Sequence, residues 1–122
     1  MDETHEQYLQ KYDEGEYHLP NNEMMVVSNY RVIFLKHDNP HRDNGPSIIY
    51  HDGTEFWHSN GKRHRLDGPA VTWKTGLKEW WISGREITKK IKPWATEQGI
   101  DLDNLTNDDK VLIKLVWEDY RD

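Results

Sequence analysis

The chain has 122 residues, of which 34% are hydrophobic, so it can form one domain with a thin core supported by six Trp, six Tyr and two Phe. It has no apolar run of membrane-spanning length, no signal-peptide pattern and no cysteine for disulfides or thiolate metal sites. These features predict a cytoplasmic protein that does not enter a membrane. The net charge of −6 argues against non-specific nucleic-acid binding.

The first predicted segment, residues 1–20, is an acidic N-terminal arm. Residues 1–30 contain seven acidic side chains and a single Lys. Within the arm, residues 3–13 have the spacing of a short helix, and the apolar side of this helix would comprise Tyr8, Leu9 and Tyr12. The rest of the arm is interpreted as a solvated surface.

Residues 24–40 are predicted to form two strands, at residues 24–27 and 30–36, or one long bent strand. Phe34 aligns with Trp57 of the repeat described next. The segment therefore resembles an earlier, degenerate copy of that repeat, and we predict that it caps the N-terminal end of the sheet.

Residues 41–86 contain one unit twice, at an offset of 23 residues and without a gap. Repetition at such a period predicts stacked supersecondary units in which each copy packs on its neighbours. The identical pairs are His41 with His64, Arg42 with Arg65, Gly45 with Gly68, Pro46 with Pro69, Gly53 with Gly76, Trp57 with Trp80 and Gly61 with Gly84.

Turn signals divide each unit into short strands. Asn60-Gly61 favours a type I′ hairpin turn, and Ser83-Gly84 is its weaker copy. The intervening β-branched and aromatic runs predict an antiparallel meander. The predicted strands are residues 47–50, 54–59 and 62–65 in the first unit, and residues 70–73 and 77–82 in the second.

Alternation along these strands predicts two faces. Spacing-matched aromatic residues favour packing, so the predicted structural core of the repeat comprises Tyr50, Trp57, Trp73 and Trp80. Phe56, His58 and Trp81 fall on the opposite face, which would serve as a binding surface or be covered by the terminal helices. Together with nearby arginines, the predicted partner-binding residues are Arg42, Phe56, His58, Arg63, Arg65 and Trp81.

Residues 87–122 are predicted to form a helical cap over the open end of the sheet. A helix over residues 88–98 contains Pro93, which would kink it or start a turn, and ends at Gly99. A second helix begins after Thr106, which forms a capping box with Asp109. Its predicted buried stripe comprises Val111, Leu112, Leu115 and Val116, widened by Ile113, Trp117 and Tyr120. A helix that is apolar on both sides is either well buried or meets another molecule.

The repeated His-Arg pairs allow a structural and a chemical interpretation. Because both residues recur in each unit, we favour structural roles at the turns. His37, His41 and Asp38 could instead belong to a metal-dependent nuclease or phosphodiesterase, but Asn39-Pro40 prevents the helix that would bring the two histidines together. No phosphate-cradling loop or nucleophile motif is present, so we predict no metal, no cofactor and no catalytic residues.

The segment from Trp57 through Asn60-Gly61-Lys62 and His64-Arg65 to residues 67–70 resembles the repeat of MORN-like proteins from tailed phages and large DNA viruses. Ser47, Thr75 and Ser83 depart from the usual pattern. The resemblance implies stacked β-hairpins and a viral origin, and it implies no catalytic residue.

The predicted fold is therefore α+β: an antiparallel meander of repeated hairpins with a short N-terminal helix and C-terminal helices capping the sheet. The expected function is that of a non-enzymatic accessory protein in the host cytoplasm, which binds and inhibits a host protein such as a defence factor. The sequence also allows the protein to form a homo-oligomer. The alternatives are a nucleotide or nucleic-acid binding module and a small metal-dependent nuclease.

Overall fold

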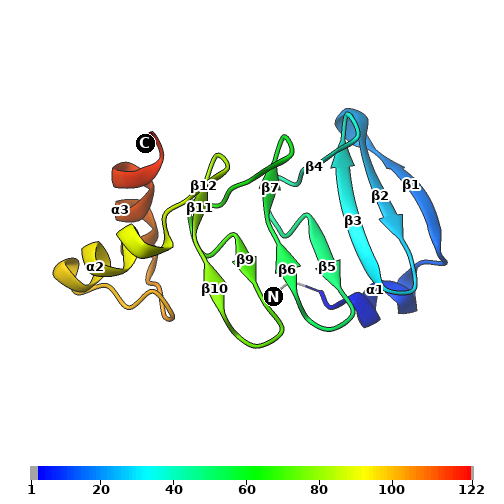
Figure 1. Cartoon of the computed structure of the whole chain (residues 1–122). Coiled ribbons are helices and arrows are strands. Elements are labelled where there is room, and N and C mark those ends of the chain that lie inside the picture. The colour runs from blue at the N-terminus through cyan, green and yellow to red at the C-terminus, as the bar shows by residue number, and fades with distance from the viewer. Residues whose placement is uncertain (1–2, 122) are drawn as a thin grey trace.

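The computed structural model describes residues 3–121 and shows the α+β fold that the sequence predicts. Helix α1 (His5–Lys11) precedes a row of antiparallel hairpins, and helices α2 (Thr88–Gln98) and α3 (Asn107–Trp117) follow it (Figure 1). A 3-10 turn, η1 (Pro20–Asn22), joins the first two strands. The strands are β1 (Gly15–Leu19), β2 (Glu23–Val27), β3 (Arg31–Lys36), β4 (Asn39–Pro40), β5 (Ile48–Tyr50), β6 (Glu55–Phe56), β7 (His58–Ser59), β8 (Lys62–Arg63), β9 (Val71–Thr72), β10 (Lys78–Glu79), β11 (Trp81–Ile82) and β12 (Arg85–Glu86).

Within residues 3–121 the strands form one long sheet and two small ribbons. The sheet has the order β1-β2-β3-β5-β6-β9-β10, with β4 paired to β3, and the ribbons are β7–β8 and β11–β12. Trp57 alone separates β6 from β7, and Trp80 alone separates β10 from β11. The strands predicted at residues 54–59 and 77–82 are thus each interrupted at their tryptophan.

Tight turns recur every 23 residues along one edge of this row, at residues 37–38, 60–61 and 83–84. Both residues of each pair have positive φ, for example 49° at Asn60 and 84° at Gly61, as type I′ turns require. The Gly61 N–H donates to the carbonyl of Pro40 at 2.9 Å, and the Gly84 N–H donates to that of Arg63 at 2.9 Å. The turns at residues 60–61 and 83–84 are therefore each bonded to the preceding unit.

Phe34, Trp57 and Trp80 are equivalent positions in this row. The N–H groups of Phe34 and Trp57 each donate at 2.7 Å to a carbonyl of the following unit. No unit follows Trp80, and the hydroxyl of Thr88 accepts its N–H instead, at 2.9 Å. Thr88 thus satisfies the backbone donor that the end of the row would leave without a partner.

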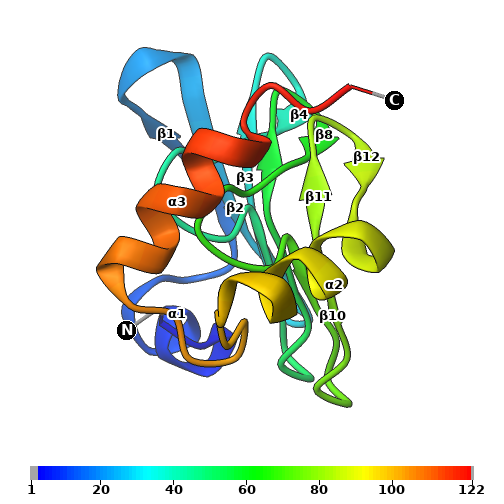
Figure 2. The same ribbon diagram turned by 90° about the vertical axis from the view of Figure 1, so that its left-hand side faces the viewer.

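The two faces of the sheet differ in their cover. Helices α1 and α3 lie on the same side, which we call the back face (Figure 2). Its buried cluster near α1 comprises Tyr8, Met25, Val27, Val32, Phe34 and Ile49, and its cluster near α2 and α3 comprises Trp80, Ile82, Ile87, Ile91 and Ile113. On the opposite side, the front face, lies the cluster of Ile33, Ile48, Phe56 and Val71. No helix of the described chain covers the front face.

The ends of the C-terminal helices agree with the sequence prediction, whereas the buried side of α3 does not. Pro93 lies inside α2 without ending it, Gly99 adopts the left-handed C-cap, and Thr106 forms the capping box with Asp109. The predicted buried stripe of α3 is wrong: Ile113 is fully buried against the Trp80 cluster. The four residues of that predicted stripe are all exposed, namely Val111, Leu112, Leu115 and Val116.

The N-terminal arm contains more regular structure than predicted. Helix α1 is capped by Thr4 and buries His5 and Tyr8, while Leu9 and Tyr12 of the predicted apolar side are exposed. The arm also supplies β1, whose polar sequence carries no clear strand pattern but pairs along its whole length with β2. Among the described residues, no helix combines the length and hydrophobicity needed to cross a membrane.

Candidate functional site

The structure divides the predicted partner-binding residues between the two faces. Phe56, His58, Arg63 and Trp81 lie together on the front face, since Phe56 stacks on His58 and the Arg63 guanidinium lies 5.0 Å from the ring centroids of both Phe56 and Trp81. Arg42 and Arg65 stack on the rings of Phe34 and Trp57 of the back face. The six residues therefore do not form one surface.

An open box of three aromatic rings marks the centre of the front face. The Phe56 ring forms the floor, and the rings of Tyr50 and Trp73 stand at 71° and 81° to it, with centroids 5.9 and 5.4 Å away. The box opens into a groove of about 690 Å³ that Leu77 and Glu79 also line.

Three residues of this box differ from their predicted environment. Phe56 was expected either on a binding surface or beneath the terminal helices, but it is only 9% exposed because the neighbouring strands place Tyr50 and Trp73 on either side of it. Tyr50 and Trp73 were expected in the core, but both are half-buried walls of the groove. They share the face of Phe56 because Ile48 pairs with Phe56 and Phe56 pairs with Val71 across the sheet.

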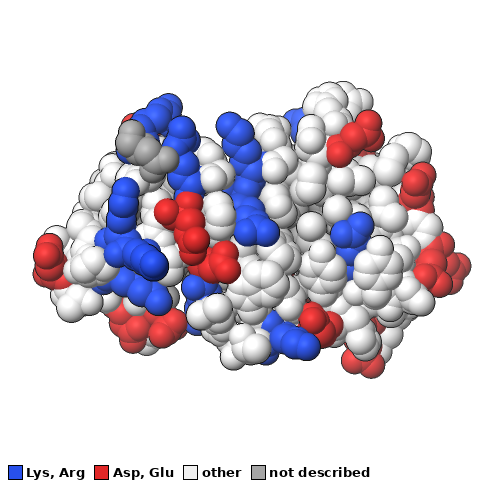
Figure 3. All heavy atoms as spheres, in the orientation of Figure 1, with Lys and Arg blue, Asp and Glu red and all other residues white. Residues whose placement is uncertain are grey.

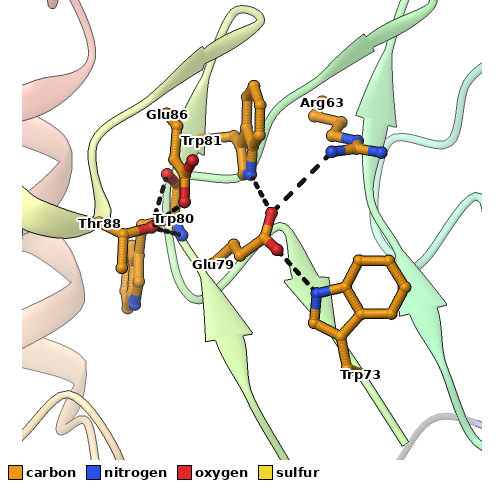
Figure 4. A network of polar contacts seen from close by, with 7 residues as sticks. All are labelled: Arg63, Trp73, Glu79, Trp80, Trp81, Glu86 and Thr88. Carbon is orange, nitrogen blue, oxygen red and sulfur yellow. Dashed lines mark hydrogen bonds and ion pairs between the residues drawn. The ribbon is translucent and has the colours of Figure 1, made fainter.

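Glu79 organises the aromatic side chains of the front face (Figure 4). One carboxylate oxygen accepts a hydrogen bond from the Trp73 indole N–H at 2.7 Å, and the other accepts from the Trp81 indole N–H at 2.9 Å. Arg63 completes the network at 3.9 Å. The carboxylate therefore holds two indole rings in fixed orientations.

The sequence analysis did not identify Glu79 as a functional residue. A detectable signal was present, because the 23-residue offset aligns Glu79 with Phe56. A carboxylate at an aromatic position of a repeat face requires hydrogen-bond donors nearby. Trp73 and Trp81, six and two residues away in the sequence, supply them.

Charged side chains occur at several places on the front face. Figure 3 shows acidic and basic groups side by side near β11 and β12, basic side chains in the middle of the face and acidic side chains at the opposite end, with uncharged side chains between them. Near β11 and β12 the charges are balanced, because Glu79 is paired with Arg63. The exposed surface of the groove is mostly apolar, although Asp52, Lys74 and Glu79 also line it.

Ser47 and His58 form a polar pair beneath the front face. The Ser47 hydroxyl lies 2.6 Å from His58 Nδ1 and 3.0 Å from the Phe56 carbonyl. Ala70 and Trp81 are the equivalent residues of the second unit. Ser47 is fully buried, so its hydroxyl holds His58 in place and is not accessible as a nucleophile.

Acidification is expected to destabilise the protein through His58. Burial and the nearby Arg63 lower the pKa of His58 from 6.5 to about 4. The unfolded chain binds this proton near pH 6.5 and the folded chain only near pH 4, so the stabilisation is complete above pH 6.5 and is lost as the pH falls through that interval. Because the ring is partly solvated, we expect a loss of about 2 kcal/mol.

Urea unfolding at neutral and at weakly acidic pH measures this loss. The matched control is His58→Gln, which keeps a polar side chain beside Ser47 but cannot titrate. The variant is expected to show a smaller loss of stability on acidification than the wild type. An identical loss in both proteins would assign the effect to other groups.

Arg42 and Arg65 make equivalent structural contacts in the two units. Such structural roles were favoured in the sequence because both arginines recur in the repeat. The Arg65 guanidinium lies 3.7 Å from the Trp57 ring centroid and donates to the Pro69 carbonyl at 3.2 Å. Arg42 repeats this arrangement on Phe34 at 4.0 Å. Trp57, predicted as core, is half-buried beneath Arg65, whereas Trp80 is 2% exposed.

The recurrent histidines, at the start of each unit, bind the hairpin turn near the end of the same unit. Nδ1 of His41 accepts the Asn60 N–H at 2.9 Å, and Nδ1 of His64 accepts the Ser83 N–H at 3.0 Å. Burial lowers the pKa of His64, which keeps its ring neutral and able to accept. These contacts fix the spacing of successive hairpins.

The structure does not assemble His37, Asp38 and His41 into one constellation. His37 and Asp38 form an exposed turn, whereas His41 is buried. Within residues 3–121, potential metal-ligand atoms of Glu23, His41 and Asp43 do lie within 4.8 Å of one another. Both His41 nitrogens are engaged inside the chain, because Nδ1 accepts from a backbone amide and Nε2 donates to Asp43 at 3.0 Å.

The fold and its surfaces define a protein built from stacked antiparallel hairpins with one uncovered aromatic face. Comparison of the chain with family models, with curated proteins and with solved structures finds no match.

Proposed function

We propose that the protein is a non-enzymatic binding protein whose front face docks an extended segment of another protein. The observation that carries this proposal is the box formed by Tyr50, Phe56 and Trp73, which is not covered by any helix of residues 3–121. Uncovered aromatic patches of this kind on folded proteins mark interaction surfaces.

The chemistry of the groove favours an aliphatic anchor side chain in the partner. The indole N–H groups of Trp73 and Trp81 already donate to Glu79, so they are not available to a ligand. Apart from the Tyr50 hydroxyl, the walls therefore offer ring faces and edges, which bind apolar groups through dispersion and burial. Leu77 is 61% exposed beside the box and extends its apolar surface.

Pre-organisation by Glu79 supports a docking role. Ordering a free side chain on binding costs about 0.5–1.5 kcal/mol, and rings that are already fixed avoid this cost. The Glu79 bonds orient both indoles before any partner arrives. Such rigid aromatic anchors are typical of binding hot spots.

The resemblance to MORN-like phage proteins indicates what kind of partner is bound and with what effect. On that basis the docked segment belongs to a host protein, such as a defence factor, and docking inhibits it. The nucleic-acid alternative is less well supported, because Arg63 lies on the front face whereas Arg42 and Arg65 stack on rings of the back face.

Substitution of Leu77 by Lys is expected to abolish docking without unfolding the protein, because the side chain is exposed and lines the groove. The matched control is Leu115→Lys, which changes a leucine that is 70% exposed on α3. Short random peptides displayed on a surface are selected against the wild-type protein. Enriched peptides should carry an aliphatic anchor and bind the Leu77→Lys variant at least about 30-fold more weakly, a loss of about 2 kcal/mol.

Three outcomes would contradict the proposal. Binding lost in Leu115→Lys but retained in Leu77→Lys would move the docking surface to α3. Self-association that Leu77→Lys abolishes would identify a second copy of the chain as the occupant. Enriched peptides without an apolar anchor would reject the aromatic box as the binding element.

A further inference from the structure

Two arginines of the back face occupy equivalent positions in the repeat but have different partners. Arg65 Nε donates to the Asp67 carboxylate at 2.8 Å, while its Nη1 donates to the Pro69 carbonyl. Arg42 Nη1 donates in the same way to the Pro46 carbonyl at 3.1 Å. At the position of Asp67, however, the first unit has Asn44.

Arg42 consequently has no ion pair with the residues that the structure describes. Its other hydrogen bond is a long one of 3.4 Å to the Tyr8 hydroxyl. Half-buried between Phe34 and Gly45, the guanidinium is also held in one orientation. A half-buried cation without a counter-charge has lost part of its hydration, and no ion pair compensates for that loss.

A polar groove of about 490 Å³ gives access to this guanidinium. Arg42, Asn44, Trp57 and Lys114 line it, the last of these from α3. Lys114 likewise has no ion pair with residues 3–121. The groove therefore presents two uncompensated cations around a half-buried aromatic ring.

The acidic side chains at this groove are already used. Asp43 accepts from His41 Nε2 at 3.0 Å, and Asp67 accepts from Arg65. Neither neutralises Arg42. Both nevertheless place negative charge at the rim, which disfavours a dianionic phosphate more than a singly charged carboxylate.

We propose that Arg42 is a receptor for a carboxylate side chain, supplied by an acidic segment of a partner protein lying in this groove. The second unit provides the template, because Asp67 shows how a carboxylate meets the equivalent arginine. An Asp or Glu of the partner supplies the negative charge that Asn44 lacks. Lys114 pairs with the next acidic residue of the partner segment. This site is on the opposite face from the aromatic box and does not depend on it.

The substitution Asn44→Asp tests the proposal by supplying the carboxylate within the chain. Asn44 is exposed, and the new aspartate reproduces the second unit, so the variant is expected to fold. The probes are a labelled oligoglutamate peptide and an oligoglutamine peptide of the same length. The wild type should bind only oligoglutamate, and Asn44→Asp should weaken that binding about tenfold or more.

The control Asn29→Asp adds the same charge at an exposed turn and should retain binding. Conversely, Asp67→Asn should strengthen oligoglutamate binding, because the substitution removes the carboxylate that pairs with Arg65 in the same groove. Leu77→Lys should leave it unchanged, which separates this proposal from front-face docking.

Equal binding of oligoglutamate by the Asn44→Asp and Asn29→Asp variants would overturn the proposal. So would a failure of the wild type to prefer oligoglutamate over oligoglutamine. A phosphoserine peptide that binds more tightly than oligoglutamate, and loses binding in Asn44→Asp, would replace the carboxylate by a phosphate.

Discussion

Replacement of Trp80 by Ala is expected to lower the free energy of unfolding by about 4 kcal/mol. The side chain is only 2% exposed and packs in one cluster with Ile82, Ile87, Ile91 and Ile113, so its removal leaves a cavity in the cluster that joins α2 and α3 to the sheet. Urea denaturation followed by far-UV circular dichroism measures the loss.

The control is Trp57→Ala, the equivalent position of the first unit. Trp57 is half-buried and is covered on one face by the Arg65 guanidinium, so we expect a smaller loss of about 1–2 kcal/mol. Equal losses in the two variants would contradict the distinction between them. Equal losses would show that Trp80, beneath the helices, is no more completely buried than Trp57 on the back face.

Substitution of Gly68 by Ala is expected to destabilise the protein by about 2 kcal/mol. A Cβ atom at this position would lie 2.6 Å from Cζ of Arg65, so the guanidinium must move. Movement removes its contact with Trp57 and its bonds to Asp67 and the Pro69 carbonyl.

A double-mutant cycle isolates this collision from other effects of the alanine. In the Arg65→Ala background the methyl group meets no guanidinium, so Gly68→Ala should then have little effect on stability. Additive losses in the double variant would show that the two residues do not interact. In the first unit Gly45→Ala should behave similarly, because its Cβ would lie 2.8 Å from Cζ of Arg42.

The sequence predicts those parts of the fold that local chemistry determines. The turns at Asn60-Gly61 and Ser83-Gly84 form because the residues at both positions tolerate positive φ. The capping box of Thr106 with Asp109 depends only on residues three positions apart. Alternation also correctly placed Phe56 and Trp57 on opposite faces of the sheet.

Which surfaces are covered depends on tertiary packing, and here the sequence was insufficient. Helix α3 is apolar on both sides, so its periodicity cannot distinguish Ile113 from Leu115. Docking against the Trp80 cluster buries Ile113 and leaves Leu115 exposed. Similarly, alternation does not specify how closely Tyr50 and Trp73 approach Phe56 from neighbouring strands.

The candidate site was predicted only in part. Phe56, His58, Arg63 and Trp81 do lie together, but Glu79 was overlooked because single acidic residues in strands are usually solvated. Arg42 was grouped with the front-face residues, since its place behind the sheet depends on the turn before Gly45-Pro46. Sequence spacing does not determine that turn's direction.

The bonds between successive turns have a consequence for the dimensions of the molecule. Because each unit forms backbone hydrogen bonds with its immediate neighbours, another 23-residue copy can be accommodated without rearranging the rest. Two additional strands would lengthen the aromatic surface by about 10 Å. Gene duplication could thus match the span of this platform to ligands of different length, while both end caps stay as they are.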